Sequence, residues 1–207
     1  MTKRYGAVRA LVGVSARFES GRITVVRGPN GSGKSTLLGI VGTLVKPTSG
    51  EVDHGALGRS RAEVRSTLGW VGHESLCYPD LSGRRNIELA ARLQGVDEQA
   101  AFERAQARFD LAAFADRPLR TYSRGQRQRV ALARGLVHEP SLLLLDEPAT
   151  GLDAASTDRL RHVVREEAER GAIVVIVTHE DRLTKGLDVG VLSLERGRRV
   201  EGDAAAP

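Results

Sequence analysis

The segment Gly28–Thr36, "GPNGSGKST", is the feature that most constrains what this chain can fold into. It follows the apolar run "RITVVR" and precedes the helical run "LLGIV", so it has the strand–loop–helix context that a phosphate-binding loop requires. Glycine allows the φ angles that turn several backbone N–H groups toward one anion, and the following helix adds N-terminal amides. The sequence therefore predicts that this loop binds the phosphates of a nucleotide.

Two side chains of the loop have predicted roles of their own. Lys34 is expected to reach the β- and γ-phosphates, and the Ser35 hydroxyl is expected to bind Mg²⁺. The residues expected around the phosphates are Gly28, Pro29, Asn30, Gly31, Ser32, Gly33, Lys34, Ser35 and Thr36. A nucleoside triphosphate site of this kind also needs a carboxylate for the metal and a group that activates water.

Both groups follow a second apolar run, in the segment "LLLLDEP". Asp146 ends the run and would lie at the carboxyl edge of a parallel sheet, where ligands of open α/β sheets bind. We expect Asp146 to hold Mg²⁺ through water and Glu147 to take a proton from the attacking water. His179 follows the next apolar run, "AIVVIVT", and is expected to contact the γ-phosphate at the same edge.

The order of apolar and amphipathic segments predicts an α/β fold. Short β-branched runs without alternation are typical of parallel strands that are buried on both faces. These runs lie at residues 22–28, 67–72, 141–146 and 172–178. Helical patterns lie at residues 34–44, 84–94, 97–109, 123–137 and 154–170. We expect one domain, residues 1–207, with a mainly parallel sheet flanked by helices and a helical subdomain inserted at about residues 73–129.

The composition argues against several other classes of protein. The net charge of +5 suggests nucleic-acid binding, yet the arginines are scattered along the chain with acids between them, so we expect no nucleic-acid partner. A single cysteine excludes an internal disulfide. No apolar run approaches the ~18 residues that span a bilayer, and the N-terminus lacks the apolar segment of a signal peptide.

A further motif resembles one protein family. The segment Tyr122–Gln126, "YSRGQ", is similar to the Leu-Ser-Gly-Gly-Gln signature of ATP-binding cassette (ABC) proteins, and its spacing before Asp146 is close to that usual in the family. The segment "TGLD" at 150–153 is similar to the family's D-loop. His179 stands where the family has its switch histidine, and Tyr5 where it has an aromatic ring that stacks on adenine.

The resemblance implies the ABC ATPase fold, a P-loop core with an antiparallel β portion at the N-terminus. It implies a nucleotide-binding subunit that hydrolyses ATP with Mg²⁺ as a head-to-tail homodimer, or as a heterodimer with a related ATPase. In such a dimer Ser123, Gly125 and Gln126 of one protomer close over the nucleotide of the other, near Asp153 of the D-loop. Closure and reopening would drive a transmembrane permease from the cytoplasmic face of the cell membrane.

The sequence departs from the family pattern at three places. Tyr122 replaces the leucine of the signature, and Arg124 replaces its first glycine. The sequence also begins close to Tyr5, so the short strand expected ahead of that residue is missing or not included. The first two departures place a larger and a charged side chain beside the expected contact with the partner's nucleotide.

Within the family, the sequence favours the ATPase subunit of a transporter. It lacks the large insertion of chromosome-maintenance ATPases and the second cassette of translation factors. The "GHE" tripeptide and the "SRGQRQR" signature are similar to the ATPase subunit of the cytochrome c-maturation haem exporter, and a generic exporter subunit fits equally well. A soluble regulatory ATPase and a small-molecule phosphotransferase are alternatives, although the signature argues against the second.

The segment 70–79, "WVGHESLCYP", holds three chemically active side chains, His73, Glu74 and Cys77. A zinc site would need a second pair of ligands at the proper spacing, which the sequence lacks. The resemblance instead places the Q-loop here, whose glutamine reaches Mg²⁺ and the attacking water. The usual spacing from Leu81 puts His73 in the position of that glutamine, and Glu74 would substitute if the loop shifted by one residue. Cys77 is expected to be a small, half-buried side chain at the permease contact.

Overall fold

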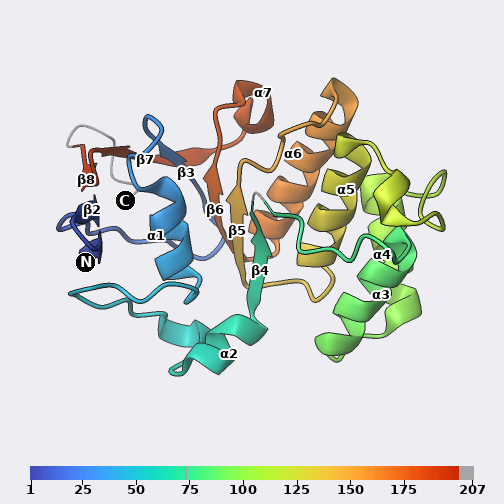
Figure 1. Ribbon diagram of the computed structural model, residues 1–207, viewed down its shortest axis with the longest axis horizontal. Coiled ribbons are helices and arrows are strands. Elements are labelled where there is room, and N and C mark those ends of the chain that lie inside the picture. The colour runs from blue at the N-terminus through green and yellow to red at the C-terminus, as the bar shows by residue number, and fades with distance from the viewer. Residues whose placement is uncertain (73, 201–207) are drawn as a thin grey trace.

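A six-stranded sheet lies at the centre of the molecule, with helices on both of its faces (Figure 1). The structure is a computed structural model that describes residues 1–72 and 74–200. The strands of this sheet, in spatial order, are β4 (Leu68–Val71), β5 (Leu142–Asp146), β6 (Ile173–Val177), β3 (Ile23–Arg27), β7 (Val189–Glu195) and β8 (Arg198–Arg199). The first five run parallel, and β8 pairs antiparallel with β7. The predicted α/β fold with a mainly parallel sheet is confirmed.

A two-stranded antiparallel sheet precedes this core. It consists of β1 (Lys3–Tyr5) and β2 (Val8–Leu11), with Tyr5 opposite Val8. The antiparallel N-terminal portion is therefore also confirmed. In Figure 1 these strands lie beside β8, at the edge of the molecule farthest from α3 and α4.

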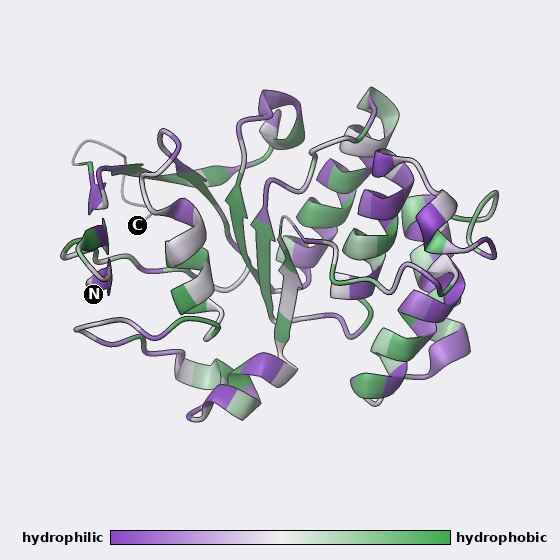
Figure 2. Cartoon of the chain, viewed as in Figure 1, coloured by the Kyte–Doolittle hydropathy of each residue, from purple (hydrophilic) through white to green (hydrophobic). Residues whose placement is uncertain are grey.

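The helices cover the two faces of the central sheet unequally. They are α1 (Lys34–Val41), α2 (Arg61–Ser66), α3 (Gly83–Leu93), α4 (Glu98–Phe109), α5 (Arg124–Gly135), α6 (Ala154–Glu169) and α7 (Asp181–Thr184), with 3₁₀ turns at Gly55–Leu57 and Leu119–Thr121. Alternate residues of β5 enter two separate cores. Leu143 and Leu145 pack with α3 to α6, and Leu142 and Leu144 pack with α1. The strands are thus buried on both sides, which explains their continuous apolar sequences (Figure 2).

Between β4 and β5 the described residues form helices α3, α4 and α5 and contain no strand. Each of these helices begins at a side chain that accepts a hydrogen bond from the backbone of the first turn, and α6 begins in the same way. The capping residues are Ser82, Asp97, Ser123 and Asp153. The helical subdomain at about residues 73–129 remains our proposal for the division of the chain. Among the described residues, no helix is both long and apolar enough to cross a membrane.

Tyr122, which replaces the signature leucine, joins three segments of this helical region. Its hydroxyl donates a hydrogen bond to the carbonyl of Phe114 (2.5 Å) and accepts one from the N–H of Gly83 (3.2 Å). Its ring stands edge-on to that of Phe114, at 5.0 Å between centroids. Burial raises the pKa of the phenol, so the hydroxyl stays protonated and keeps its donor role. A leucine would fill the same space without tying the start of α3 to the signature.

Candidate active site

The phosphate loop joins β3 to α1 and is fixed by close contacts on two sides. Gly28, Gly31 and Gly33 all have positive φ angles, of 145°, 79° and 103°. A Cβ at Gly28 would lie 2.1 Å from the carbonyl oxygen of Leu194, and one at Gly33 would lie 2.4 Å from that of Ala10. These two glycines are therefore required by the packing of β7 and β2, in addition to the turn itself.

Replacing Gly33 by alanine is expected to lower the free energy of unfolding by about 3 kcal/mol, because the new Cβ meets backbone and the φ angle is left-handed. Gly31→Ala is the matched control, since a Cβ at Gly31 meets nothing within 4 Å. That variant carries only the φ penalty of about 1–2 kcal/mol. Urea unfolding followed by circular dichroism measures both variants. Equal losses of stability would contradict the close contact at Gly33.

Lys34 occupies the centre of the loop. Only 8% of its surface is exposed, and its ammonium donates to the carbonyl oxygens of Gly28 (2.7 Å) and Pro29 (3.1 Å). The hydroxyl of Ser32 is buried nearby without a hydrogen-bond partner in the described part of the chain. The loop thus holds a buried cation and an unused donor, a combination that suits an anion.

The strand β5 delivers two acids to the carboxyl edge of the sheet. Asp146 is 3% exposed, and its Oδ1 is buried with no hydrogen-bond partner among the described residues. A carboxylate oxygen without a donor suits a hydrated cation, since Mg²⁺ prefers oxygen ligands and keeps several of its waters. The residues present therefore fit a magnesium ion.

Glu147 has a left-handed backbone conformation, with φ of 51°, that residues other than glycine rarely adopt. Its N–H donates to the carbonyl of Val177 (2.8 Å), which fixes the turn after β5 against β6. Its carboxylate faces His179: Oε2 accepts from the backbone N–H of His179 (3.3 Å), and Oε1 lies 3.5 Å from the imidazole Nε2. The strained backbone thus directs the Glu147 carboxylate toward the end of β6.

The sheet brings the predicted residues together because their strands are neighbours. Val177 lies opposite Asp146 in β5 on one side and opposite Val26 in β3 on the other. The phosphate loop, the Asp146–Glu147 pair and His179 therefore follow three adjacent strands at one edge of the sheet. This is the edge at which open α/β sheets bind ligands.

The signature segment is joined to the turn at residues 150–153 and not to the phosphate loop of its own chain. Ser123 and Gln126 form a reciprocal cap at the start of α5, with side chain to backbone distances of 3.2 Å and 3.1 Å. A Cβ at Gly125 would lie 2.7 Å from the carbonyl oxygen of Gly151. Within the described chain, no hydrogen bond connects the signature to residues 28–36.

Asp153 ends that turn and caps α6. Its carboxylate accepts the N–H of Ser156 (2.7 Å), and this hydrogen bond lowers the pKa of Asp153. The signature and the D-loop segment thus form one interlocked surface at the N-termini of two helices. Helix N-termini of this kind favour negatively charged ligands.

Tyr5 and Cys77 lie outside this cluster. Tyr5 ends β1 and is 49% exposed, with the ammonium of Lys3 at 4.8 Å from its ring centroid. His73 lies outside the described residues. Cys77 is half-buried, and its Sγ lies 3.2 Å from the carbonyl oxygen of Ser75. Burial raises the pKa of the Cys77 thiol, which disfavours the nucleophilic thiolate.

Sequence reasoning did not find the cavity that borders Glu147. Its volume is about 200 Å³, and it is lined by Gly72, Ser75, Arg124, Arg127, Gln128, Glu147 and Thr150. The amide of Gln128 donates to the carbonyl of Pro148 (2.8 Å), which holds α5 against the turn after Glu147. The spacing of positions 124, 127 and 128, one face of a helix, is the signal that would have grouped them.

The comparison with known proteins agrees with this geometry. A family model described as ABC transporter matches residues 11–150. The chain belongs to the ABC transporter family. It is 39% identical, over 86% of its length and 85% of the relative's, to the cytochrome c biogenesis ATP-binding export protein CcmA 2 of Cupriavidus metallidurans. It is 34% identical, over 97% of its length and 89% of the relative's, to the arginine transport ATP-binding protein ArtP of Escherichia coli (strain K12).

A solved structure of the same family shares the fold. It is the dimeric post-hydrolysis state of the ATP-binding cassette MJ0796 bound to ADP and Pi, with 28% identity and a TM-score of 0.81. The match covers 96% of this chain and 92% of that one. The chain is thus an ABC nucleotide-binding subunit. Members of this family bind ATP, and the similarity to ABC ATPases implies ATP hydrolysis.

Proposed function

We propose that this ABC subunit hydrolyses MgATP and, through closure of a dimer, drives a separate transmembrane permease. The observation that carries the proposal is the meeting of Lys34, Asp146 and the Glu147–His179 pair at one edge of the sheet. The alternative function is that of a regulatory ABC ATPase without a membrane partner, which would use the same site. The names of the relatives, one concerned with export and one with arginine transport, support the transporter assignment.

In this proposal each predicted residue has a definite task. The loop Gly28–Thr36 binds the phosphates, with Lys34 as the cation closest to them. Ser35 and Asp146 hold Mg²⁺, which when bound neutralises phosphate charge. Glu147 takes the proton of the attacking water, and His179, which lies beside the Glu147 carboxylate, contacts the γ-phosphate.

Three further tasks rest on the family resemblance. Tyr5 stacks on the adenine, since its ring is exposed at the end of β1. His73 or Glu74 contacts the attacking water from the Q-loop, and this loop touches the permease. Ser123, Gly125 and Gln126 close over the nucleotide of the partner protomer beside Asp153, as a homodimer or as a heterodimer with a related ATPase. The separation of the signature from its own phosphate loop supports this arrangement in trans.

Mixing two inactive variants tests the head-to-tail dimer. Lys34→Ala removes the phosphate cation. Ser123→Asp keeps a good helix cap but places a carboxylate beside the triphosphate, so each variant alone is expected to be inactive. In a mixed dimer one composite site has an intact loop and an intact signature. Equal mixing is expected to restore about a quarter of the wild-type ATPase rate, because about half of the dimers are mixed and each has one intact site.

The readout is phosphate release at fixed total protein. As a control, Ser123→Ala loses the cap but adds no charge, so it is expected to retain more activity than Ser123→Asp. A mixture that stays inactive while each variant remains folded would contradict the trans arrangement. Recovery of the ATPase together with a membrane protein from detergent extracts tests the permease partner. Exclusive recovery as a free ATPase favours the regulatory alternative.

The substrate that the transporter would carry, its cargo, is proposed from short segments of the sequence and from the names of the relatives. The "GHE" and "SRGQRQR" segments and the relative named for cytochrome c biogenesis and export support haem export. The similarity to an arginine transport subunit shows that the nucleotide-binding chain alone does not distinguish cargoes. Stimulation of ATPase activity by haem, in vesicles that contain the permease, would select the first assignment.

A further inference from the structure

The side chain of Arg124 lies over the turn that follows Glu147 in its own chain. Arg124 replaces the first glycine of the signature and is the first residue of α5. A Cβ at Gly151 would lie 2.8 Å from the Cγ and Cδ atoms of Arg124 and 3.1 Å from its Nε. The methylene stem therefore covers Gly151 directly, whereas the resemblance alone would direct this side chain toward the partner's nucleotide.

Two hydrogen bonds close the turn that follows Glu147. The N–H of Thr150 donates to the carbonyl of Glu147 (3.1 Å), and the N–H of Leu152 donates to that of Ala149 (3.0 Å). Glu147 and Gly151 both have positive φ angles, of 51° and 82°. Backbone of this kind, at a residue other than glycine, persists only where the surrounding structure fixes it.

Helix α5 supplies three contacts that fix this turn. The stem of Arg124 covers Gly151, and a Cβ at Gly125 would lie 2.7 Å from the Gly151 carbonyl oxygen. One helical turn farther on, the amide of Gln128 donates to the carbonyl of Pro148 (2.8 Å). The start of α5 therefore braces the turn that carries the proposed general base.

The contribution of Arg124 to this brace is packing and not charge. Its side chain also lines the cavity of about 200 Å³ that borders Glu147. The side chain is exposed, and within the described chain its guanidinium forms no hydrogen bond or ion pair. Long basic side chains commonly cover a surface with their stems while the charged group stays in water.

We propose that Arg124 is a positioning residue for the site of its own chain, because its stem holds the turn after Glu147 and thereby places the Glu147 carboxylate. This role rests on the ATP hydrolysis proposed above. In the dimer, the signature closes over the partner's nucleotide, while the Arg124 side chain serves the chain to which it belongs. A displaced carboxylate lowers the rate of hydrolysis and leaves nucleotide affinity largely intact.

The test compares two variants that both remove the charge of Arg124. Arg124→Ala also removes most of the stem, and it is expected to lower the ATPase kcat about tenfold while MgATP affinity stays within about twofold. Arg124→Met keeps an unbranched stem in a residue that also favours helices, so it is expected to recover most of the wild-type kcat. If Arg124→Met lost as much activity as Arg124→Ala, the charge would be the active part and the proposal would be overturned.

Mixed dimers show which of the two sites Arg124 serves. In the mixture of Lys34→Ala and Ser123→Asp, the working site takes its phosphate loop and Glu147 from the Ser123→Asp protomer. Adding Arg124→Ala to that protomer is expected to lower the recovered ATPase rate about tenfold. Adding it to the Lys34→Ala protomer, which supplies only the signature, is expected to change the rate by less than about twofold. A loss of equal size in both mixtures, or one confined to the second, overturns the proposal.

Amide hydrogen exchange of the nucleotide-free chain is a readout that does not require ATP hydrolysis. Arg124→Ala is expected to speed exchange at Thr150 and Leu152 about tenfold, and Arg124→Met is expected to leave it near the wild-type rate. Unchanged exchange in Arg124→Ala overturns the proposal. If exchange changed as expected but the wild-type chain released no phosphate from ATP, the proposed function would be refuted and the contact of Arg124 with its own turn would be supported.

Discussion

Replacing Glu147 by glutamine is expected to lower the ATPase kcat by about 10²- to 10⁴-fold, the usual contribution of a general base. The amide has nearly the size of the carboxylate, so the strained turn at φ 51° and its hydrogen bond to Val177 remain. Glutamine does not accept a proton from water at neutral pH. ATP affinity is expected to persist, and size-exclusion chromatography with ATP is expected to show a stable dimer.

Glu180→Gln is the matched control for this variant. Glu180 follows His179 in the chain and is exposed, and its N–H donates to the Thr178 hydroxyl (3.0 Å). The change removes the same charge close to the site without touching the Glu147 carboxylate. A kcat near that of the wild type is expected for the control. If Glu147→Gln hydrolysed ATP as fast as Glu180→Gln, Glu147 would not be the base.

The predicted part of the site rests on local signals that the fold preserves. The segment between "RITVVR" and "LLGIV" forms a loop because its glycines accept positive φ angles and its flanks form β3 and α1. The runs that end in Asp146 and Thr178 form adjacent parallel strands. Their carboxyl ends must then lie at one edge, so a pattern of apolar runs was enough to bring Asp146, Glu147 and His179 together.

The features that the sequence did not predict depend on contacts between distant segments. Gly28 and Gly33 are tight against Leu194 and Ala10, residues that no short motif connects to the loop. In the sequence Tyr122 is a departure from the signature, and only the structure shows that its hydroxyl links Phe114 and Gly83.

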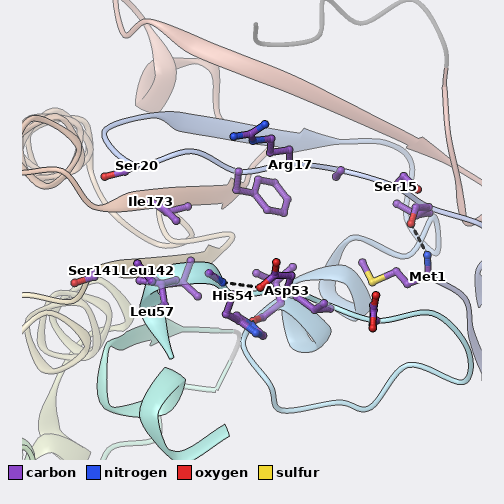
Figure 3. Close-up of a pocket in the computed structure, with 18 of the residues that line it drawn as sticks. Met1, Ser15, Arg17, Ser20, Asp53, His54, Leu57, Ser141, Leu142 and Ile173 are labelled. Atoms are coloured by element: carbon purple, nitrogen blue, oxygen red, sulfur yellow. Dashed lines mark hydrogen bonds between the residues drawn. The ribbon is translucent and has the colours of Figure 1, made fainter. Parts of the chain in front are cut away.

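A cavity of about 810 Å³ at the start of β5 and β6 (Figure 3) is lined in part by two segments without regular secondary structure, residues 14–18 and 51–54. Neither segment carries a periodic pattern, and the hydrogen bonds of Met1 with Val14 and of Thr2 with Ser49 depend on tertiary register. Sequence periodicity reports which face of an element is buried, but not which distant segments meet. The cavity is therefore visible only in the three-dimensional arrangement.

Lys34→Ala is expected to weaken MgATP binding by about 10- to 150-fold, which corresponds to the ~1.5–3 kcal/mol of a charged hydrogen bond. The ammonium now binds the carbonyls of Gly28 and Pro29, so it is held in place before the nucleotide arrives. Its removal leaves the phosphates with the backbone N–H groups and hydroxyls of the loop but no cation, at a position from which most solvent is excluded. Isothermal titration calorimetry with MgATP measures the change.

The control for this prediction is Lys185→Ala, because Lys185 is exposed and follows α7. The same loss of charge there is expected to leave the affinity within about twofold, since exposed charges are screened by solvent. If both variants weakened binding equally, the effect would come from net charge and not from contact with phosphate. If Lys34→Ala bound MgATP as tightly as the wild type, residues 28–36 would not form the phosphate site, whatever their resemblance. If only Lys34→Ala loses affinity for MgATP, the phosphates contact Lys34, the cation that the loop encloses.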